Sequence, residues 1–184
     1  MEEVLPEEIA RKCFNAATTN RATPYPFGKR ANYDYNKRKW VSSTGWHKML
    51  DEKFFKPTLL PFLTTECKNY ITIDKTDKWR AEWVADPPGF HLETHPDIPE
   101  KKLSAMIYLG YKKTEGTSLY GSGKDKGKTK HIPSGYNVGM LFFPSKKTLH
   151  GFPRDRAVNN YRYAFLINIV DKTFKEEPFW PVTF

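Results

Sequence analysis

The chain has 184 residues, of which 39% are hydrophobic and 28% are charged, and its net charge is +9. This composition excludes an intrinsically disordered chain, and the length is enough to bury the core of one domain. No apolar run approaches the roughly 20 residues of a membrane-spanning helix. The acidic N-terminus lacks the apolar stretch of a secretory signal, and the two cysteines, Cys13 and Cys67, form no Cys-x-x-Cys pair. We therefore expect a cytoplasmic protein with reduced thiols.

The first third of the chain contains two predicted helices with an irregular segment between them. Residues 6–18 begin with a proline and two acidic residues, as the first turn of a helix often does, and then place apolar side chains on one stripe. Residues 45–56 have a similar apolar face and form the second predicted helix, and Pro57 and Pro61 are expected to bound the segment that follows it. The intervening residues 20–44, rich in proline, asparagine and lysine, indicate irregular structure.

From about residue 70 the sequence changes to short β runs separated by turns. About eight strands after two helices predict a mainly β fold, a double-stranded β-helix (jelly roll) with N-terminal supporting helices. We expect a single domain over residues 1–184, with support at 1–69 and the jelly-roll core at about 70–171. The candidate strands are Tyr70–Ile73, Trp79–Ala85, Gly89–Thr94, Leu103–Leu109, Thr117–Tyr120, Val138–Phe143, Leu149–Phe152 and Tyr161–Val170.

Two histidines and one aspartate form a pattern of metal ligands. His95 and Asp97 stand two residues apart near the end of a predicted strand, so their side chains emerge on one face. His150 follows a later apolar strand, which a jelly roll can bring alongside the first. Two imidazoles with one carboxylate form the set that holds iron(II) and leaves positions open for a co-substrate and oxygen. We therefore predict these three residues as the metal ligands and the catalytic centre.

The sequence contains three further histidines, His47, His91 and His131. His91 and Glu93 would share the face of His95 in a regular strand, which makes them rival ligands or walls of the site. The pair of His95 and Asp97 is preferred because it lies at the strand end. His47 and His131 belong to no such pattern, and we expect both to face solvent.

An arginine opens the last apolar strand. Arg162 precedes the run Tyr-Ala-Phe-Leu-Ile-Asn-Ile-Val, and a buried guanidinium there could clamp a dicarboxylate beside the metal. Arg154 and Arg156 are nearer to His150 in sequence, but they lie in a turn rich in proline and aspartate and rank lower. The alternative for Arg162 is a surface arginine on a strand, which its apolar neighbours disfavour.

In this order the motifs resemble the 2-oxoglutarate/iron(II)-dependent dioxygenase superfamily, closest in pattern to its prolyl-4-hydroxylase-like branch. The resemblance covers residues 79–171. It is carried by Gly89-Phe90, by His95-x-Asp97, by Tyr108-Leu-Gly, by Gly116-Thr-Ser-Leu-Tyr, by Phe143-Pro144, by His150-Gly and by Arg162-Tyr-Ala.

The resemblance implies a jelly roll that binds Fe(II) through His95, Asp97 and His150. It implies 2-oxoglutarate as co-substrate, with its far carboxylate bound by Arg162 and by the hydroxyl of Tyr108, and ascorbate as an accompanying reductant. The implied reaction is hydroxylation of an unactivated C–H bond, with release of succinate and carbon dioxide. The intact carboxylate at Asp97 favours hydroxylation over halogenation, because the family's halogenases carry a small residue there.

The resemblance says less about the substrate. A peptidyl proline or another amino-acid residue is the leading class, and a free amino acid or a sugar-type metabolite is the alternative. Members that repair DNA or RNA bases carry a second arginine where this chain has Asn168, so nucleic acid is disfavoured. The alternative of a different class is a cupin-like metal-binding jelly roll without 2-oxoglutarate chemistry. Arg162 discriminates, because metal binding alone needs no buried arginine.

Two basic segments bear on partners. Residues 29–39 mix lysine and arginine with aromatic residues, which suits an extended peptide, a nucleic acid or simply a solvated loop. Residues 112–130 combine lysines with glycines and indicate a mobile loop, either a substrate lid or a surface loop. The net charge of +9 fits an anionic substrate or solubility alone. No membrane partner is expected, and the oligomeric state is left open.

Overall fold

The described chain begins with two helical segments. Helix α1 spans Glu7–Thr19. A second helix is described from Met49 onward, continues as the π-helix η2 over Asp51–Leu59 and ends as α3 over Leu60–Thr65. No helix among the described residues is long and apolar enough to cross a membrane. The computed structural model describes residues 3–19, 23–24, 39–40, 49–121, 127, 129–152 and 160–174.

The second helix differs from the prediction at its C-terminal end. Pro57 lies inside η2 and Pro61 in the first turn of α3, so the predicted end of the helix at residue 56 is wrong. Proline disrupts an α-helix because it lacks the N–H and its ring meets the carbonyl one turn back. Here the turn is wider, with the amide of Leu60 bonded to the carbonyl oxygen of Phe55, and the chain continues past Pro57. Residues 45–48 of the predicted helix lie outside the described part.

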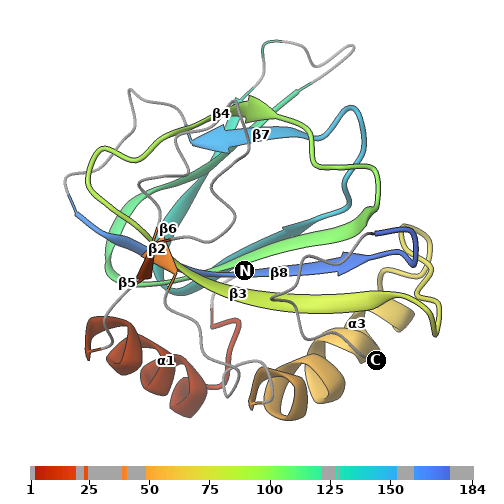
Figure 1. Ribbon diagram of the computed structural model, residues 1–184, viewed down its shortest axis with the longest axis horizontal. Coiled ribbons are helices and arrows are strands. Elements are labelled where there is room, and N and C mark those ends of the chain that lie inside the picture. Colours follow the sequence, from red (N-terminus) through yellow and green to blue (C-terminus); the bar gives the residue numbers. More distant parts are fainter. Residues whose placement is uncertain are drawn as a thin grey trace.

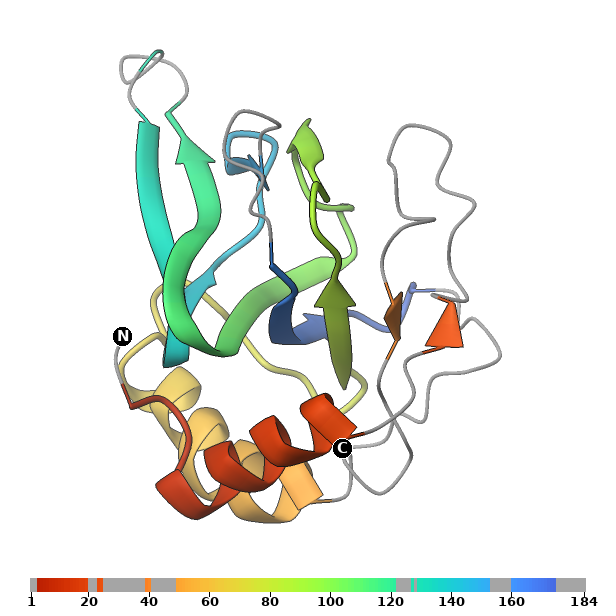
Figure 2. The ribbon, with the colours of Figure 1, turned by 90° about the vertical axis from the view of Figure 1, so that its left-hand side faces the viewer.

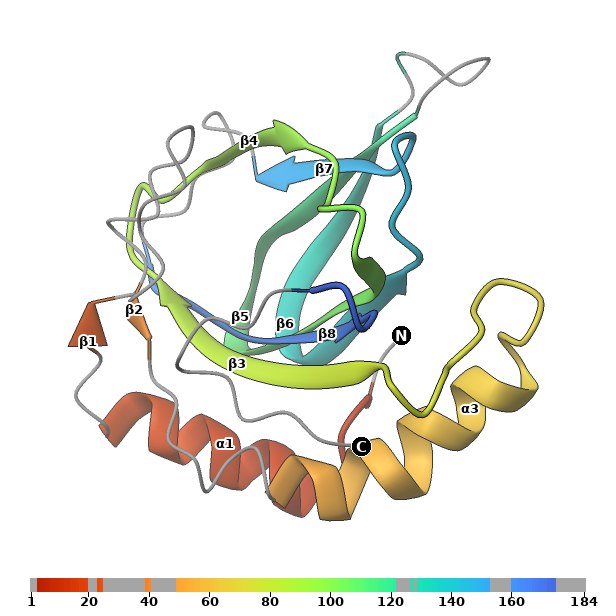
Figure 3. The same ribbon diagram turned by 45° about the vertical axis from the view of Figure 1, so that its right-hand side comes forward.

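The strands form one curled antiparallel sheet (Figure 1). Its order is β1-β2-β3-β8-β5-β7-β4, with β6 paired to β5. Figure 3 shows the sheet wrapping round so that β4 and β7 face β3 and β8 across the interior. The predicted jelly roll with supporting helices is confirmed. The strands are β1 Thr23–Pro24, β2 Lys39–Trp40, β3 Lys78–Asp86, β4 Leu92–His95, β5 Lys101–Tyr120, β6 Thr129–Phe142, β7 Leu149–Phe152 and β8 Arg162–Val170.

Strand β5 connects the two halves of the roll. Its first part pairs with β8 as far as Tyr108, and its last three residues, Ser118–Tyr120, pair with β7. Strand β6 pairs with it from Ser104 to Tyr120, with register shifts between Tyr108 and Thr117 (Figure 2). The two strands predicted at Leu103–Leu109 and Thr117–Tyr120 are therefore one bent strand. The bends come from these irregularities, which re-aim a strand without ending it.

Two other predictions are corrected in this region. Residues 112–120 and 129–130 lie in β5 and β6, so the predicted loop at 112–130 is in large part a hairpin, and residues 122–126 and 128 lie outside the described part. No strand forms at Tyr70–Ile73, because the amides of Tyr70 and Ile71 both bond back to the carbonyl oxygen of Cys67 in the turn after α3.

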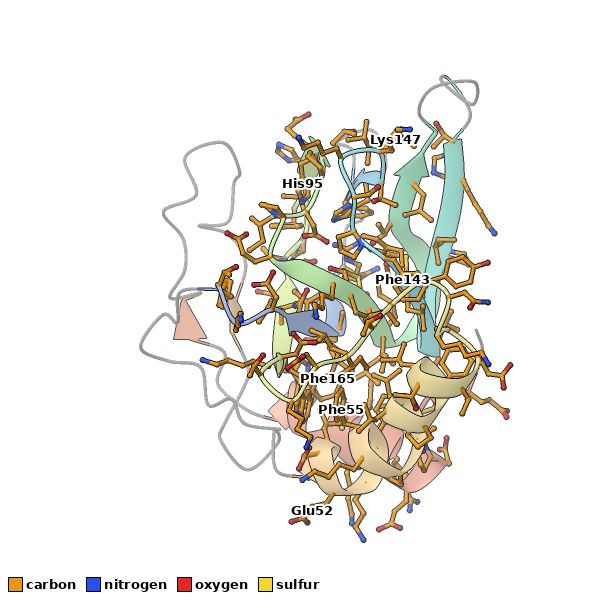
Figure 4. All side chains as sticks on the ribbon, turned by 90° about the vertical axis from the view of Figure 1, so that its right-hand side faces the viewer. Glu52, Phe55, His95, Phe143, Lys147 and Phe165 are labelled. Carbon is orange, nitrogen blue, oxygen red and sulfur yellow. The ribbon has the colours of Figure 1, made fainter. Side chains whose placement is uncertain are left out.

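Side-chain alternation divides the central sheet into two faces. Residues on the outer face pack against the helices: Trp79 and Trp83 of β3, and Phe165 of β8, belong to the core cluster that includes residues of α1, η2 and α3. Phe55 stacks on Trp79 with ring centroids 4.1 Å apart. Figure 4 shows Phe55 and Phe165 on this helical side and His95 at the opposite end of the molecule.

The inner face of the same strands carries a different set of buried side chains. Val84, Tyr108 and Ala164 form a second buried cluster, with Met106 and Leu166 packed against it. Strand β8 is therefore buried on both faces, which explains its nearly continuous apolar run. Polar side chains also occur on this inner face, and they compose the site described below.

The close approach of β5 to β6 requires a glycine at position 116. A Cβ atom there would overlap the carbonyl oxygen of Ile132, a backbone atom that cannot move aside cheaply. We expect Gly116→Ala to lower the free energy of unfolding by about 2 kcal/mol, measured by urea denaturation. Gly110→Ala is the matched control in the same strand, because nothing lies within 4 Å of a Cβ atom there. Equal losses in the two variants would contradict this account of the bend.

Candidate metal centre

The three predicted ligands come together at the paired ends of β4 and β7. His95 is the last residue of β4 and stands directly opposite His150 in the register with β7. The ring centroids of the two imidazoles are 4.4 Å apart. Asp97 follows two residues after His95, and one donor atom from each of the three residues lies within 4.8 Å of the others. Among the described residues, this is the one group of three or more histidine, cysteine, aspartate or glutamate side chains close enough together to hold a metal ion.

Backbone carbonyls orient both imidazoles. The Nδ1 atom of His95 lies 2.8 Å from the carbonyl oxygen of Glu93, and that of His150 lies 3.4 Å from the carbonyl oxygen of Thr148. A carbonyl oxygen can only accept, so Nδ1 carries the hydrogen in each neutral ring. The lone pair is then on Nε2, where a metal ion can bind it.

The carboxylate of Asp97 is buried, and each of its two oxygens has a hydrogen-bond donor. Lys101 Nζ lies 2.6 Å from Oδ1, and Ser104 Oγ donates to Oδ2 at 2.5 Å. Burial acts to raise the pKa of Asp97, but the ammonium of Lys101, the nearby His150 and these two hydrogen bonds outweigh it, so the pKa is lowered overall. The carboxylate is therefore ionised at neutral pH, as a metal ligand must be.

The imidazole of His150 is held neutral. Burial lowers its pKa to about 4, and the opposing attraction of Asp97 does not compensate for the lost hydration. The ring also packs against Phe142, whose centroid is 4.8 Å away. A neutral imidazole keeps its lone pair available, so protons do not compete for His150 at physiological pH.

A buried ion pair lies on the inner face of the sheet. Arg162 and Asp86 are directly paired residues of β8 and β3, and their exposed fractions are 4% and 2%. Nε and Nη2 of Arg162 both donate to Oδ2 of Asp86, at 3.1 and 2.6 Å. The remaining nitrogen, Nη1, is buried and finds no acceptor among the described residues. A buried N–H donor without an acceptor is suited to bind a carboxylate oxygen supplied by a ligand.

Aromatic residues connect this arginine to the metal ligands. The guanidinium carbon of Arg162 lies 3.8 Å from the ring centroid of Phe152 and 5.9 Å from that of Tyr108. Phe152 is two residues after His150 and shares its face of β7, so the arginine lies about 7 Å along the strand from the metal ligand. A short molecule with an acidic group at each end could contact both.

Tyr108 is buried, and its hydroxyl is 2.7 Å from Thr117 Oγ1. Burial raises its pKa, so the phenol stays protonated. If Thr117 donates to it, the phenol proton is free to bond a ligand beside Arg162.

The remaining predicted residues fall elsewhere. His91 has its Nδ1 atom 3.4 Å from the carbonyl oxygen of Gly89 and, like the exposed Glu93, lies outside the metal-ligand cluster. His131 is exposed as expected, although its Nδ1 contacts the buried Ser118 hydroxyl at 2.8 Å. Asn168 is buried next to Ser104. The positions of His47, Arg154 and Arg156 lie outside the described residues.

Sequence reasoning missed five residues of the site. Asp86 ends an apolar strand, and an acidic residue at such a place is itself a signal. Lys101 stands four residues after Asp97 and would have been found by pairing charges. No sequence pattern indicated a site role for Ser104, Thr117 or Phe152. The missed residues are Asp86, Lys101, Ser104, Thr117 and Phe152.

The sequence matches no protein-family model and no curated protein. Solved structures do match. A Trichoplax adhaerens prolyl hydroxylase, in complex with a peptide fragment of the hypoxia inducible factor oxygen degradation domain, has a TM-score of 0.68 at 14% identity, over 96% of this chain and 86% of that one. A Pseudomonas putida prolyl-4-hydroxylase has a TM-score of 0.61 at 12% identity, over 93% and 90%. HygX from Streptomyces hygroscopicus, with nickel and 2-oxoglutarate bound, has a TM-score of 0.60 at 8% identity, over 96% and 83%.

The fold is thus the jelly roll of the 2-oxoglutarate/iron(II) oxygenases, and the neighbours that share it include prolyl hydroxylases. Identities this low establish the fold alone. The assignment of a metal to His95, Asp97 and His150 remains a prediction, supported by the proximity of their donor atoms.

The pKa of His150 predicts how stability depends on pH in the metal-free protein. The unfolded chain protonates this imidazole near its ordinary value of 6.5, whereas the folded chain does so only near 4. Between these values the unfolded state binds more protons, so stability decreases as the pH falls through that window, by about 3 kcal/mol in total. The pKa of Asp97 lies below its ordinary 3.8, so the stability that its ionised carboxylate contributes is lost only at a pH below the His150 window.

Urea denaturation of chelator-treated protein at pH 6.5 and pH 4 measures this loss. We expect the difference in unfolding free energy between the two pH values to shrink in His150→Gln, which has no titrating ring. A difference equal to that of the wild type would show that His150 is not held neutral by the fold.

Proposed function

We propose that this protein is an Fe(II)- and 2-oxoglutarate-dependent dioxygenase that hydroxylates an unactivated C–H bond, with the whole chain serving as one domain. The observation that carries the proposal is the pair of sites on one interior face. The His95, Asp97 and His150 cluster supplies a metal-ligand set, and Arg162 offers a buried donor without an acceptor among the described residues. One neighbour with this fold, HygX, has nickel and 2-oxoglutarate bound.

The residues present fit both groups. Two imidazoles and an ionised carboxylate would hold iron(II) and leave coordination positions open. Arg162 Nη1 and the Tyr108 hydroxyl would bind the far carboxylate of 2-oxoglutarate. Bound iron and 2-oxoglutarate would activate molecular oxygen, which is the oxidant: one oxygen atom would go to the substrate as a hydroxyl group and the other to succinate, with carbon dioxide released. Ascorbate would serve as the accompanying reductant.

The protein's own contribution is position and a dry environment. Val84, Tyr108 and Ala164 form an apolar wall on the inner face, which excludes water around the clamped carboxylate. The guanidinium carbon of Arg162 lies over the ring of Phe152, 3.8 Å from its centroid, and this contact restricts the movement of the guanidinium. Asp97 remains ionised and His150 neutral, so neither of these two residues has to lose a proton before a metal ion binds.

For the substrate, we propose a peptidyl proline or another amino-acid residue. Two of the neighbours are prolyl hydroxylases, and one of these is in complex with a peptide. A small molecule is the alternative, since HygX also has a structure with hygromycin B bound. The net charge of +9 suits an anionic substrate. The free thiols of the buried Cys13 and Cys67 suit the reducing cytoplasm.

One observation favours the alternative class, a cupin-like jelly roll that binds metal without 2-oxoglutarate. Asp86 already neutralises Arg162, so this pair could be a structural element with no ligand. The acceptor-free Nη1 atom argues against that interpretation, because a purely structural pair has no need of a spare buried donor.

An anaerobic titration separates these functions. Metal-free protein is titrated with Fe(II) and then with 2-oxoglutarate, and the visible charge-transfer band of the chelate is recorded. We expect the band in the wild type, its loss in His95→Ala and its weakening in Arg162→Ala. Iron binding without a band would reject the oxygenase function and favour the cupin-like alternative.

Arg162→Lys tests the clamp more gently, because lysine still neutralises Asp86. The planar fork of arginine can bond Asp86 and a second carboxylate at once, whereas one ammonium does this poorly. We expect the affinity for 2-oxoglutarate to fall by about tenfold or more, and the affinity for Fe(II) to stay as in the wild type. Isothermal titration of each in turn measures both. Unchanged 2-oxoglutarate affinity would remove Arg162 from the site.

A further inference from the structure

The two oxygens of Asp97 have partners of different kinds. Oδ1 meets the ammonium of Lys101 at 2.6 Å, whereas Oδ2 accepts a hydrogen bond from the neutral hydroxyl of Ser104. The side chains of Lys101 and Asp97 are only 11% and 6% exposed, so the ion pair is largely removed from water. The pair thus gives the buried carboxylate a counter-charge within the protein itself.

The hydroxyl of Ser104 belongs to a buried relay. Its oxygen lies 2.5 Å from Asp97 Oδ2 and 3.1 Å from Oδ1 of Asn168. A hydroxyl has a single proton to donate, and the ionised carboxylate is the stronger acceptor. The Asn168 amide is therefore better placed with its NH₂ group toward Ser104, so that it donates to the hydroxyl oxygen while the hydroxyl donates to Asp97.

These partners affect a bound cation in opposite ways. A neutral donor on one oxygen fixes the orientation of the carboxylate and can remain in place when the other oxygen binds a metal ion. An ammonium on the other oxygen competes with the metal ion for the same charge and repels it. Lys101 has a long, flexible stem, which lets its ammonium move away once a stronger cation arrives.

We propose that Lys101 is an internal competitor for the metal site: its ammonium holds Asp97 in the metal-free protein and must leave when the metal ion binds. Ser104, supported by Asn168, is a positioning residue that keeps the carboxylate aimed at the two histidines. The inference rests on the proposed metal site. It predicts that removing one partner of Asp97 strengthens metal binding and that removing the other weakens it.

The chain provides a matched control in the adjacent residue. Lys102 also pairs with a buried aspartate, with its Nζ atom 2.7 Å from Oδ2 of Asp77. Asp77 is 2% exposed and also accepts from the amide of Asp74, in the turn before β3. Lys102→Met therefore removes a comparable ion pair without touching the metal-ligand cluster.

The test uses Mn²⁺ alone as the probe, with binding to chelator-treated protein measured from the loss of the free-ion electron paramagnetic resonance signal. We expect Lys101→Met to bind Mn²⁺ about tenfold more tightly than the wild type, because the competing and repelling charge is gone. Ser104→Ala should bind about tenfold more weakly. Lys102→Met should match the wild type.

Lys101→Gln covers the case in which Lys101→Met fails to fold, because glutamine keeps a hydrogen-bond donor for Asp97 without the charge. It too should bind Mn²⁺ more tightly than the wild type. Affinity that is unchanged or weaker in a folded Lys101 variant would overturn the competition. If the wild type binds Mn²⁺ no better than His150→Ala does, the metal site itself fails, which is a different result.

Discussion

The alternation of side chains along β3, β5 and β8 is the constraint on which the rest of the structure depends. Successive residues of these strands face opposite sides of the sheet, so a single sequence must satisfy a helix-packed layer and a functional interior at once. Trp83 and Phe165 face the helix-packed layer, whereas Asp86 and Arg162 face the interior. A slip of one residue would exchange the two sets and place charges under the helices. The large aromatic side chains of the outer face therefore fix the register that aims the arginine inward.

The same logic explains how far the sequence could be interpreted. The His95–His150 contact was predictable because the period of a strand is two and a jelly roll pairs distant strands. The pairing of Asp86 with Arg162 was not, because it depends on the register between β3 and β8, which no local pattern encodes. The helix continues past Pro57 because its turns are wider there, and β5 continues through its bends because irregularities replace a loop. Local propensity marks such places as breaks, and tertiary packing overrides it.

Burying charge is costly, and this fold does so in matched pairs. Asp97 is paired with Lys101, Asp86 with Arg162, and Asp77 with Lys102. Breaking such a pair leaves one uncompensated charge and typically costs several kcal/mol, although the intact pair adds little net stability. The pairs thus explain how a site rich in ionisable groups can be formed before any ligand arrives.

Under the proposed function, that balance also suits the incoming groups. A histidine binds a metal ion only as a neutral ring, and the two pairs of the site, Asp97 with Lys101 and Asp86 with Arg162, each sum to zero. An Fe(II) ion and a 2-oxoglutarate dianion likewise sum to zero, so with both bound and the ammonium of Lys101 displaced the site would carry one negative charge. Fe(II) alone would leave one uncompensated positive charge, and 2-oxoglutarate alone would leave two negative ones, which low polarity penalises. Under this proposal the positive charge left by the metal ion attracts the dianion, so the electrostatics of the site favour the metal ion and the co-substrate binding together.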